Sequence, residues 1–352
     1  MRNLLPLTKP PKKICILRLS ALGDVAHVIP VVRAIQNHWP NTQITWICGK
    51  FEYKLLSSIE GVKFVLFDKK QGWKAYFKLH RELKGEHFDV LLHMQVALRA
   101  SLASMCVSAK IKLGWDKARS RDFHQLFINH SIPAVAHQHQ AQGFLSFARS
   151  LGIEVEEPIW DIPVSKEGEL FADQHIEKDK KTLLISPCSS HVLRNWSAEG
   201  YAAVADYAIE QLGMQVIISG GPSEVEKQMS REIESRLTNE VTNLVGKDTL
   251  QQLVGLLKNV DVVISPDSGP VHIANALGTP VIGLYACTWS KRSGPYSFLN
   301  NCVDKFEMAA QKFRKKSADQ LRWGSKIEEP DVMDLIQPNE VMEKLEQVIR
   351  GA

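Results

Sequence analysis

A carboxylate stands immediately after the first strand-like run of the chain. Residues 13–19 are mostly apolar, a turn follows at 20–24, and apolar side chains then recur at helical spacing. Ligands of doubly wound sheets bind beyond the carboxyl ends of the strands. Asp24 is therefore a candidate general base for a hydroxyl nucleophile. An Asp at a helix start also caps free backbone N–H groups, and spacing alone favours this role. The turn does not match GxGxxG, so the dinucleotide fingerprint is absent.

A second candidate site combines a proline-shaped loop with a helix start. Asp267, Ser268 and Gly269 follow a strand predicted at 261–265, and Pro270 suits the first position of a helix predicted at 270–277. Small residues and free N–H groups at a helix start form an anion site, and we expect His272 to lie beside a bound phosphate. A capped helix in an ordinary α/β domain is the alternative. The exposed loop and the histidine favour the anion site.

Two loops in the second half of the chain add polar groups at strand ends. The first contains Ser189, Ser190 and Arg194, and hydroxyls beside an arginine fork suit a phosphate or diphosphate. A solvated arginine on a surface loop explains these residues equally well. In the second loop, glycines at 220–221 permit a tight turn before Glu224. We expect the Glu224 carboxylate either to accept hydrogen bonds from ribose hydroxyls or to favour the helix dipole.

Cations are concentrated in the first half of the chain. Residues 1–155 carry 22 Lys and Arg against 10 Asp and Glu, whereas residues 156–352 carry 21 against 29. The excess gathers with aromatic side chains at 69–84 and 110–121. A half this basic predicts an anionic partner, which would be nucleic acid, a phosphorylated glycolipid or an acidic membrane face. A solvated helix face is the plain alternative. The candidate anion-binding cations are Lys69, Lys74, Arg119 and Arg121.

Strand-like and helix-like segments alternate on both sides of a linker. Before the linker, strands are predicted at 13–19, 43–48, 62–67 and 89–94, with helices at 72–84 and 97–107. Residues 152–165 have linker composition. After them, strands are predicted at 182–186, 215–219, 241–245, 261–265 and 280–284, with helices between them. This βαβ rhythm predicts an α/β protein with two doubly wound, Rossmann-like domains facing each other across a cleft. The predicted domains are residues 1–155 and 166–337.

Composition excludes several classes of protein. The 352 residues are 44% hydrophobic and 23% charged, which is typical of a globular protein. No window reaches the roughly 18 apolar residues of a membrane-spanning helix. Arg18 and Asp24 interrupt the apolar stretch near the N-terminus, so no secretory signal is predicted. The 6 cysteines show no CxxC spacing and no His/Cys cluster, which predicts reduced thiols in a cytoplasmic protein and no metal site.

Two of these motifs resemble those of one enzyme family. Residues 17–25 (LRLSALGDV), followed by Pro30, are similar to the opening motif of the ADP-heptose:lipopolysaccharide heptosyltransferases, glycosyltransferase family 9. Residues 265–272 (SPDSGPVH) resemble the D-[ST]-G-x-x-H motif of that family, and residues 278–285 (GTPVIGLY) are similar to the segment that follows it. The resemblance covers nearly the whole chain, with both motifs in order and about one domain apart.

The resemblance implies a GT-B fold in which a last helix at 338–352 crosses back onto the first domain. It implies inverting transfer of heptose from ADP-L-glycero-D-manno-heptose, without a metal or another cofactor. The implied acceptor is Kdo-lipid A, which places a cytoplasmic enzyme peripherally at the inner membrane, with no nucleic acid and no partner protein. Asp24 falls on the catalytic base, and Arg194 falls on the phosphate-contacting lysine of a Lys-x-Trp motif. The donor site falls on Arg194, Glu224, Asp267, Ser268, Gly269 and His272, and Arg119 and Arg121 fall on acceptor-binding cations.

The loop hydroxyls of Ser189 and Ser190 complete the predicted donor site, and Lys69 and Lys74 complete the predicted acceptor site. The chain departs from the family pattern at Arg194, at the hydroxyl-rich Ser189-Ser190 stretch and at residues 286–295. It looks most similar to members that add the first heptose to a phosphorylated Kdo. The alternatives are a GT-B transferase or epimerase for another nucleotide sugar and, in a different class, a basic membrane- or nucleic-acid-binding protein without catalysis. No helix-turn-helix or RNA-recognition signature supports the nucleic-acid alternative.

Overall fold

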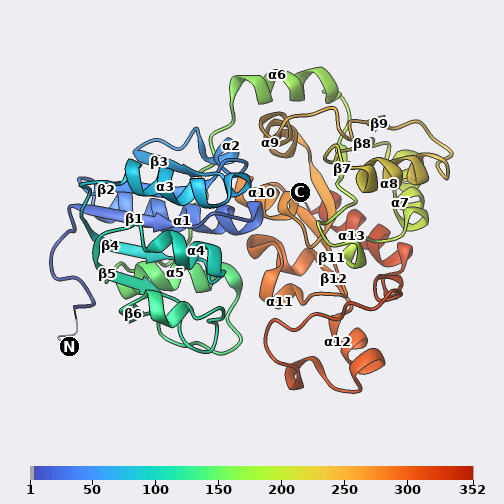
Figure 1. Cartoon of the computed structure of the whole chain (residues 1–352). Helices are drawn as coiled ribbons and strands as arrows, with labels where there is room; N and C mark the ends of the chain where they lie inside the picture. The colour runs from blue at the N-terminus through green and yellow to red at the C-terminus, as the bar shows by residue number, and fades with distance from the viewer. Residues whose placement is uncertain (1–3, 352) are drawn as a thin grey trace. The chain divides into compact units, whose positions relative to one another are not determined.

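The chain divides into two compact units, with the boundary between Pro163 and Val164. The computed structural model describes residues 4–351. The boundary falls inside the segment 152–165 whose composition predicted a linker. Each unit contains one six-stranded sheet in which every pair of neighbouring strands is parallel (Figure 1). The predicted α/β class is therefore confirmed.

The first sheet has the strand order β3-β2-β1-β4-β5-β6. Its strands are β1 (Lys13–Leu17), β2 (Gln43–Gly49), β3 (Val62–Phe67), β4 (Phe88–His93), β5 (Ala109–Gly114) and β6 (His130–Ser131). Four of the five β1 residues are buried because helices cover both faces of a parallel sheet, so polar and apolar residues do not alternate along the strand. Strands β2 and β3 lie on one side of β1, and strands β4 to β6 lie on the other side, so the order of the strands reverses between β1 and β4. Loops after these two strands therefore border the crevice where doubly wound folds bind ligands.

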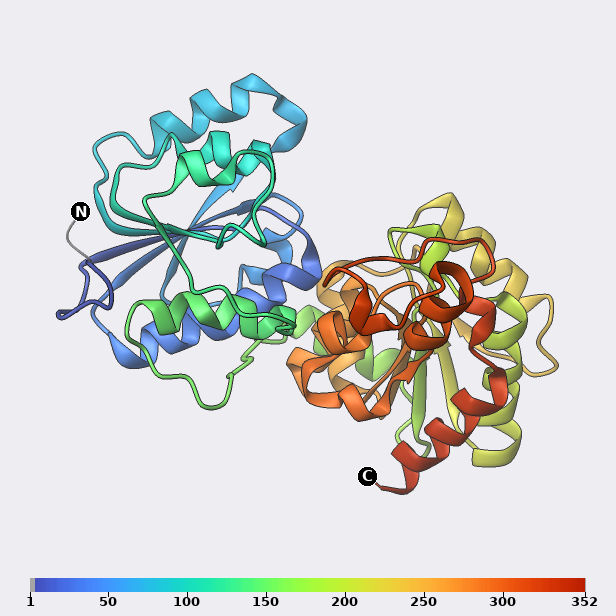
Figure 2. The ribbon, with the colours of Figure 1, turned by 90° about the horizontal axis from the view of Figure 1, so that it is seen from below.

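Helices cover both faces of the first sheet (Figure 2). On one face α1 (Leu22–His38) packs against α5 (Gln140–Ser150), and on the other α3 (Trp73–Glu82) and α4 (Leu98–Ser104) share a core with β1 and β4. Short helical segments are α2 (Tyr53–Leu56), η1 (Lys69–Gln71) and η2 (His124–Phe127). The sequence reading missed α5, β5 and β6.

The second sheet repeats the topology of the first, with the order β12-β11-β10-β7-β8-β9. Its strands are β7 (Thr182–Ile185), β8 (Gln215–Ile218), β9 (Thr242–Asn243), β10 (Val262–Pro266), β11 (Val281–Tyr285) and β12 (Val303–Asp304). Here the direction of strand addition reverses between β7 and β10. The loops that contain Arg194 and Asp267 follow these two strands, so both lie at the reversal point.

The helices of the second unit form two packed groups. α7 (Ala198–Leu212) contacts α8 (Glu224–Glu234), while α9 (Leu250–Asn259) contacts α10 (Gly269–Leu277) and α6 (Lys166–His175). Gly168 and Gly255 let α6 and α9 approach closely, because a Cβ atom on either residue would collide with the opposite backbone. The remaining short helical segments are η3 (Val192–Arg194), α11 (Ser290–Ser293), η4 (Tyr296–Asn301), α12 (Phe306–Ala309), η5 (Ala310–Arg314), η6 (Ala318–Gln320) and η7 (Met333–Leu335). The sequence reading missed α6 and β12.

The last helix, α13 (Pro338–Arg350), packs on the second unit. This corrects the expectation that the helix at 338–352 crosses back onto the first domain. Val341 and Leu345 are fully buried in the core that contains α7. Lys181 Nζ also donates to the Ile349 carbonyl at 2.9 Å. The apolar face of α13 thus finds its partners within its own unit.

Within residues 4–351, no helix combines the length and the apolar character that crossing a membrane requires.

Candidate active site

An arginine and a carboxylate are in contact where β1 ends and α1 begins. Arg18 forms an ion pair with Asp24, and its Nη1 donates to the Met94 carbonyl at 2.7 Å in the loop after β4. Asp24 Oδ2 also accepts from the Ala21 backbone N–H at 3.4 Å, which supports the start of α1. The side chain of Arg18 is 10% exposed and that of Asp24 is 31% exposed. The carboxylate is therefore held by the protein on one side and open to solvent on the other, so it can both support the helix start and accept a proton.

Charged groups from the segments after β2, β3 and β5 lie near this pair. Burial lowers the pKa of Arg18 below its ordinary value, although the adjacent Asp24 carboxylate opposes this effect. The charge of Arg121 lowers the pKa of Arg18 further, and the charge of Glu52 raises it. Burial raises the pKa of Glu52, and the charge of Lys69 opposes that rise. The structure thus brings three predicted residues (Asp24, Lys69 and Arg121) to one sheet end. Sequence reasoning missed Glu52, although a carboxylate three residues after the end of β2 is a usable signal.

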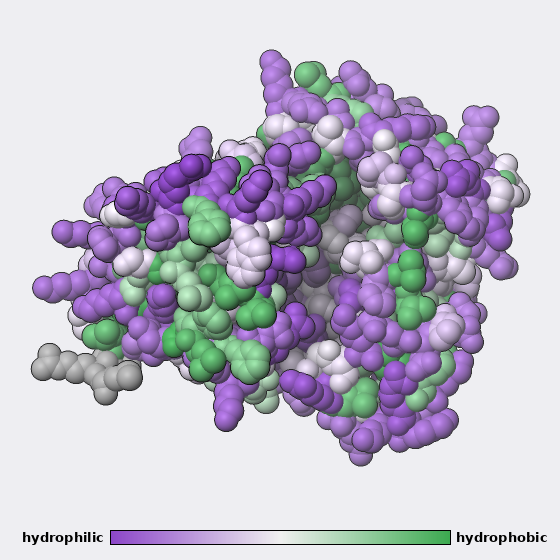
Figure 3. Space-filling view, viewed as in Figure 1, coloured by the Kyte–Doolittle hydropathy of each residue, from purple (hydrophilic) through white to green (hydrophobic). Residues whose placement is uncertain are grey.

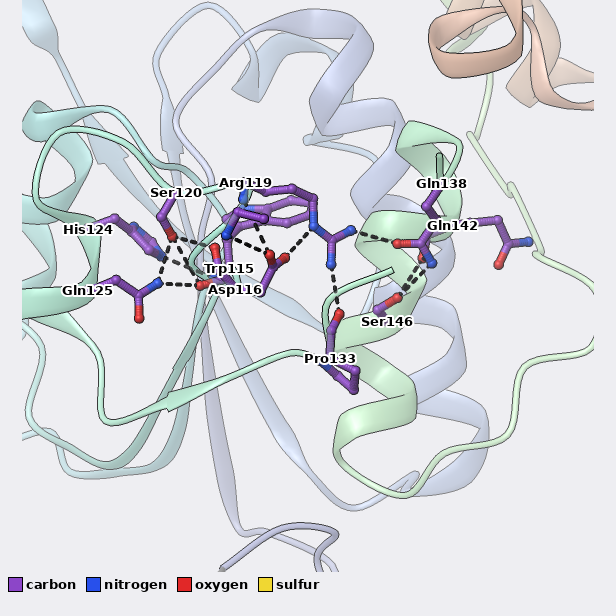
Figure 4. Close-up of polar contacts among 11 residues, drawn as sticks. Trp115, Asp116, Arg119, Ser120, His124, Gln125, Pro133, Gln138, Gln142 and Ser146 are labelled. Atoms are coloured by element: carbon purple, nitrogen blue, oxygen red, sulfur yellow. Dashed lines mark hydrogen bonds and ion pairs between the residues drawn. The ribbon is translucent and has the colours of Figure 1, made fainter. Parts of the chain in front are cut away.

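Arg119 belongs to a polar network that joins the loop after β5 to the loop before α5 (Figure 4). Its Nε pairs with Asp116, its Nη1 donates to Gln138 Oε1 at 2.6 Å, and its Nη2 donates to the Pro133 carbonyl at 2.9 Å. The guanidinium lies 5.0 Å from the centre of the Trp115 ring. A guanidinium has five N–H donors, so the three bonds leave two donors for an acceptor. Lys74, by contrast, is exposed in the first turn of α3.

A buried histidine pair lies next to the end of β4. The His93 and His124 rings are 4.4 Å apart, His93 Nε2 is 3.3 Å from Ser101 Oγ, and His124 Nε2 accepts from the Trp115 N–H at 3.1 Å. Burial lowers the pKa of His124 to about 4 and lowers that of His93 well below its ordinary value. Both rings are therefore neutral at pH 7.

Asp267 is the centre of the polar cluster in the second unit. Its Oδ2 is 3.3 Å from Arg194 Nη1, its Oδ1 is 3.8 Å from His272 Nε2, and its backbone carbonyl accepts from Ser189 Oγ at 2.9 Å. Burial raises the pKa of Asp267, but His272, Arg194 and the Thr288 hydroxyl outweigh that effect and lower the pKa overall. Asp267 is therefore an ionised anchor for the loop after β7. Sequence reasoning missed Thr288, which follows the end of β11.

The start of α10 retains backbone donors. Ser268 is the N-cap residue and Gly269 is the first helical residue, but the Ser268 side chain makes no capping bond to the helix. Its Oγ instead lies 2.8 Å from Ser265 Oγ. Uncapped first-turn N–H groups are the donors with which helix starts bind anions. Ser190 is exposed on the loop after β7.

Carboxylates other than Glu224 approach the glycine turn after β8. Glu224 is 82% exposed and pairs with Lys227 at 3.5 Å. Glu226 accepts from the Gly221 N–H at 2.7 Å. Asp248 accepts from Ser219 Oγ at 2.9 Å, and burial raises the pKa of Asp248 to about 6. Sequence reasoning missed Glu226 and Asp248. The available signal is a carboxylate in the segment that follows a strand, here β8 for Glu226 and β9 for Asp248.

In the part of the chain that the structure describes, no group of three or more His, Cys, Asp or Glu side chains is placed to hold a metal ion. The 6 cysteines are free thiols. The expected absence of a metal from the reaction remains a prediction.

Known proteins resemble this chain over most of its length. The sequence pattern of glycosyltransferase family 9 (heptosyltransferase) matches residues 76–322. This chain belongs to glycosyltransferase family 9. The family named from the two motifs is therefore confirmed, and the protein is a glycosyltransferase. A curated relative, the lipopolysaccharide core heptosyltransferase OpsX of Haemophilus influenzae, is 43% identical over 97% of this chain and 98% of its own length.

Solved structures of the family share the fold. The family 9 glycosyltransferase of Veillonella parvula superposes with a TM-score of 0.80 at 19% identity, covering 97% of this chain and 98% of its own. The E. coli heptosyltransferase WaaC with ADP gives a TM-score of 0.73 at 18% identity, covering 96% and 99% of the two chains. Together with the two sheets of identical topology, these likenesses confirm the GT-B fold of two Rossmann-like units.

Proposed function

We propose that this glycosyltransferase transfers heptose from ADP-L-glycero-D-manno-heptose to a phosphorylated Kdo of the lipopolysaccharide inner core. The observation that carries the proposal is the 43% identity to the lipopolysaccharide core heptosyltransferase OpsX, which extends over nearly the full length of both chains. Solved E. coli WaaC structures with ADP and with ADP-2-deoxy-2-fluoro heptose support an ADP-sugar as donor.

In this proposal the second unit binds the donor. The backbone N–H groups at the start of α10, from Ser268 to Val271 except at Pro270, receive the diphosphate together with Arg194. Asp267 holds Arg194 in place, and His272 lies 3.8 Å from the same carboxylate. The departing ADP gains negative charge as the sugar leaves, and fixed N–H groups and a guanidinium stabilise that charge without a metal. Ser189 and Ser190 add hydroxyl contacts, and Glu224 is the proposed ribose contact.

The first unit supplies the base and the acceptor site. Asp24 removes the proton from a Kdo hydroxyl, whose oxygen forms a bond to the anomeric carbon of the heptose. The bond between that carbon and the diphosphate oxygen breaks, its electron pair leaves with ADP, and attack from the opposite side inverts the configuration. Arg18 holds the Asp24 carboxylate in position. The cations that bind the anionic acceptor are Lys69, Lys74, Arg119 and Arg121.

Kdo-lipid A is anchored in a bilayer by its acyl chains. We therefore propose a cytoplasmic enzyme that works peripherally at the cytoplasmic face of the inner membrane, without nucleic acid and without a partner protein. The basic excess of residues 1–155 supports an anionic surface as its working place.

A turnover assay that measures ADP release tests this function. We expect turnover with ADP-heptose and Kdo-lipid acceptors, faster when the Kdo carries a phosphate, and none with UDP-sugars. Added EDTA is expected to leave the rate unchanged. Equal turnover with a UDP-sugar, or no dependence on the Kdo acceptor, would contradict the proposal.

A further inference from the structure

Large apolar side chains gather on the surface of the first unit. Figure 3 shows them over α3, α4 and the segment after β5. Each is at least 44% exposed, and Leu126 reaches 80%. We call these residues the apolar patch: Trp73, Phe77, Leu98, Met105, Phe123 and Leu126.

Contacts between the three elements make the patch continuous. The Trp73 and Tyr76 rings are 5.5 Å apart, and Tyr76 Oη donates to the Arg99 carbonyl at 3.4 Å, which joins α3 to α4. The Leu98 N–H donates to Asp122 Oδ2 at 3.3 Å, which joins α4 to the segment that carries Phe123. Met105 and Leu126 line one surface hollow of about 280 Å³. The patch is therefore one surface built from three segments and not a set of scattered side chains.

Helix α3 presents apolar residues on two sides. Ala75 and Leu79 are buried against the sheet, and they satisfy the core-facing side of the helix. Trp73 and Phe77, one turn apart, lie on the exposed side. Packing within the unit thus leaves most of the surface of these two aromatic rings exposed. A solvated helix face would carry polar groups at such positions.

Cations surround the apolar patch and outnumber the acids near it. Of the acids, Asp68 accepts from the Lys70 N–H, Asp122 accepts from the Leu98 N–H, and Glu82 lies 3.6 Å from Lys78. Each of these carboxylates therefore has a local partner. The exposed cations on α3, on α4 and in the flanking loops are Lys69, Lys70, Lys74, Lys78, Arg81, Lys84, Arg99 and Arg121.

We propose that the apolar patch docks this enzyme on a bilayer with anionic headgroups, with the aromatic rings at the level of the headgroups and the cations on the phosphates. Exposed Trp, Phe and Leu side chains beside Lys and Arg are the composition of an interfacial membrane contact. Each Lys or Arg near an anionic surface adds about 1 kcal/mol, or about fivefold in affinity. This inference rests on the proposed function in one respect: the proposed acceptor is anchored in a bilayer, so an enzyme that acts on it has to reach the bilayer surface.

Vesicle co-sedimentation of the full chain tests the docking. The wild-type protein is expected to bind phosphatidylcholine vesicles containing phosphatidylglycerol, to bind pure phosphatidylcholine vesicles weakly, and to dissociate as salt rises. The triple variant W73S/F77S/L126S is expected to bind at least about tenfold more weakly. K78E/K84E is expected to lose affinity only for the anionic vesicles. L170S, at an exposed leucine of the second unit, is the matched control and is expected to bind like the wild type.

Equal vesicle binding by the wild type and the triple variant would overturn the proposal. So would a wild-type dimer that the triple variant dissociates, because the patch would then be an interface between two copies of the chain. Thermal unfolding verifies the fold of each variant, and the exposed substitutions are expected to change it little.

Turnover on two acceptors separates this inference from the proposed function. The triple variant is expected to match the wild type on a deacylated, water-soluble Kdo acceptor and to be slower on the same acceptor embedded in anionic vesicles. If the wild type fails on the soluble acceptor, the proposed function fails while the vesicle binding still decides the docking. If the triple variant is equally slow on both acceptors, the patch acts in the reaction and not in docking.

Discussion

The two units place an arginine–aspartate pair at the same point of the same topology, but they expose different members of the pair. In the first unit, Arg18 is the more buried partner and Asp24 is 31% exposed. In the second unit, Arg194 and Asp267 are 16% and 11% exposed, and Asp267 has further partners in His272 and Thr288. One carboxylate is held yet accessible, and the other is enclosed by its neighbours.

This difference indicates how one fold serves two roles. A general base needs a carboxylate that substrate can reach, held by groups that fix its direction. A diphosphate site needs a cation in a fixed place, and an enclosed carboxylate can supply that restraint. We therefore expect Asp24 substitutions to affect turnover and Asp267 substitutions to affect donor binding and stability.

The strongest test of the comparison is Asp24→Asn. The amide keeps an oxygen for Arg18 but loses the basicity, so turnover is expected to fall about 1,000-fold while ADP affinity stays unchanged. ADP-release kinetics and calorimetric ADP titration measure the two effects. Asp161→Asn is the matched control, because Asp161 pairs with Arg33 at 3.0 Å on the surface of the same unit. Undiminished turnover in the Asp24 variant would remove Asp24 as the base.

Asp267→Ala tests the enclosed member of the comparison. It leaves the Arg194 charge without its carboxylate, which is expected to cost about 3 kcal/mol of unfolding free energy and to weaken ADP binding. Urea unfolding and ADP titration measure the changes. Asp173→Ala, at an exposed aspartate 3.8 Å from Lys178, is expected to cost little. A stable Asp267 variant with wild-type ADP affinity would show that the second pair does not anchor the donor site.

The two units are expected to respond to acid with opposite signs. Burial lowers the pKa of His124 in the folded chain to about 4. Protonation of this histidine therefore favours the unfolded chain, and the folded chain loses stability as pH falls from about 6.5 to 4. Burial raises the pKa of Asp248 in the folded chain to about 6. The folded chain therefore holds this proton more tightly than the unfolded chain does. The stability that this gives is present in acid and is lost as pH rises from about 4 to 6.

Urea unfolding between about pH 7.5 and 4.5 tests these signs. His124→Gln is expected to remove about 2 kcal/mol of the acid-induced loss in the first unit. Asp248→Asn is expected to remove the opposing trend in the second unit. An unchanged pH profile in the His124 variant would show that this histidine does not oppose protonation of the folded chain.

The smallest effect is expected for Arg194→Lys. Lysine keeps the charge near Asp267 but loses the fork, so ADP affinity is expected to fall about fivefold, or about 1 kcal/mol. Arg194→Ala loses the charge as well and is expected to have the larger effect in the same titration. A lysine variant as weak as the alanine variant would show that the bidentate geometry, and not the charge, carries the donor contact.

Much of the fold was predictable because its signals are local. Parallel strands buried on both faces read as short apolar runs, and the predicted strands from 13–19 to 89–94 correspond to β1, β2, β3 and β4. β6 and β12, which were not predicted, have two residues each, and such strands carry too little periodicity to identify. The strand predicted at 241–245 proved to be only Thr242–Asn243. The destination of α13 was also unpredictable, because an apolar helix face does not reveal which core receives it.

The sequence by itself determined the α/β class, the two motifs and their family, the candidate Asp24 and Asp267, and the asymmetry of charge. Each of these depends on neighbouring residues or on simple counts. Tertiary structure alone decided that Met94 and Glu52 lie near the Arg18–Asp24 pair, that Arg119 is bound into a network, and that six apolar side chains form one patch. The physical reason is the crossover connection. It returns the chain to the same sheet edge after some thirty residues, so the groups that meet there are distant in sequence and no local pattern records their contact.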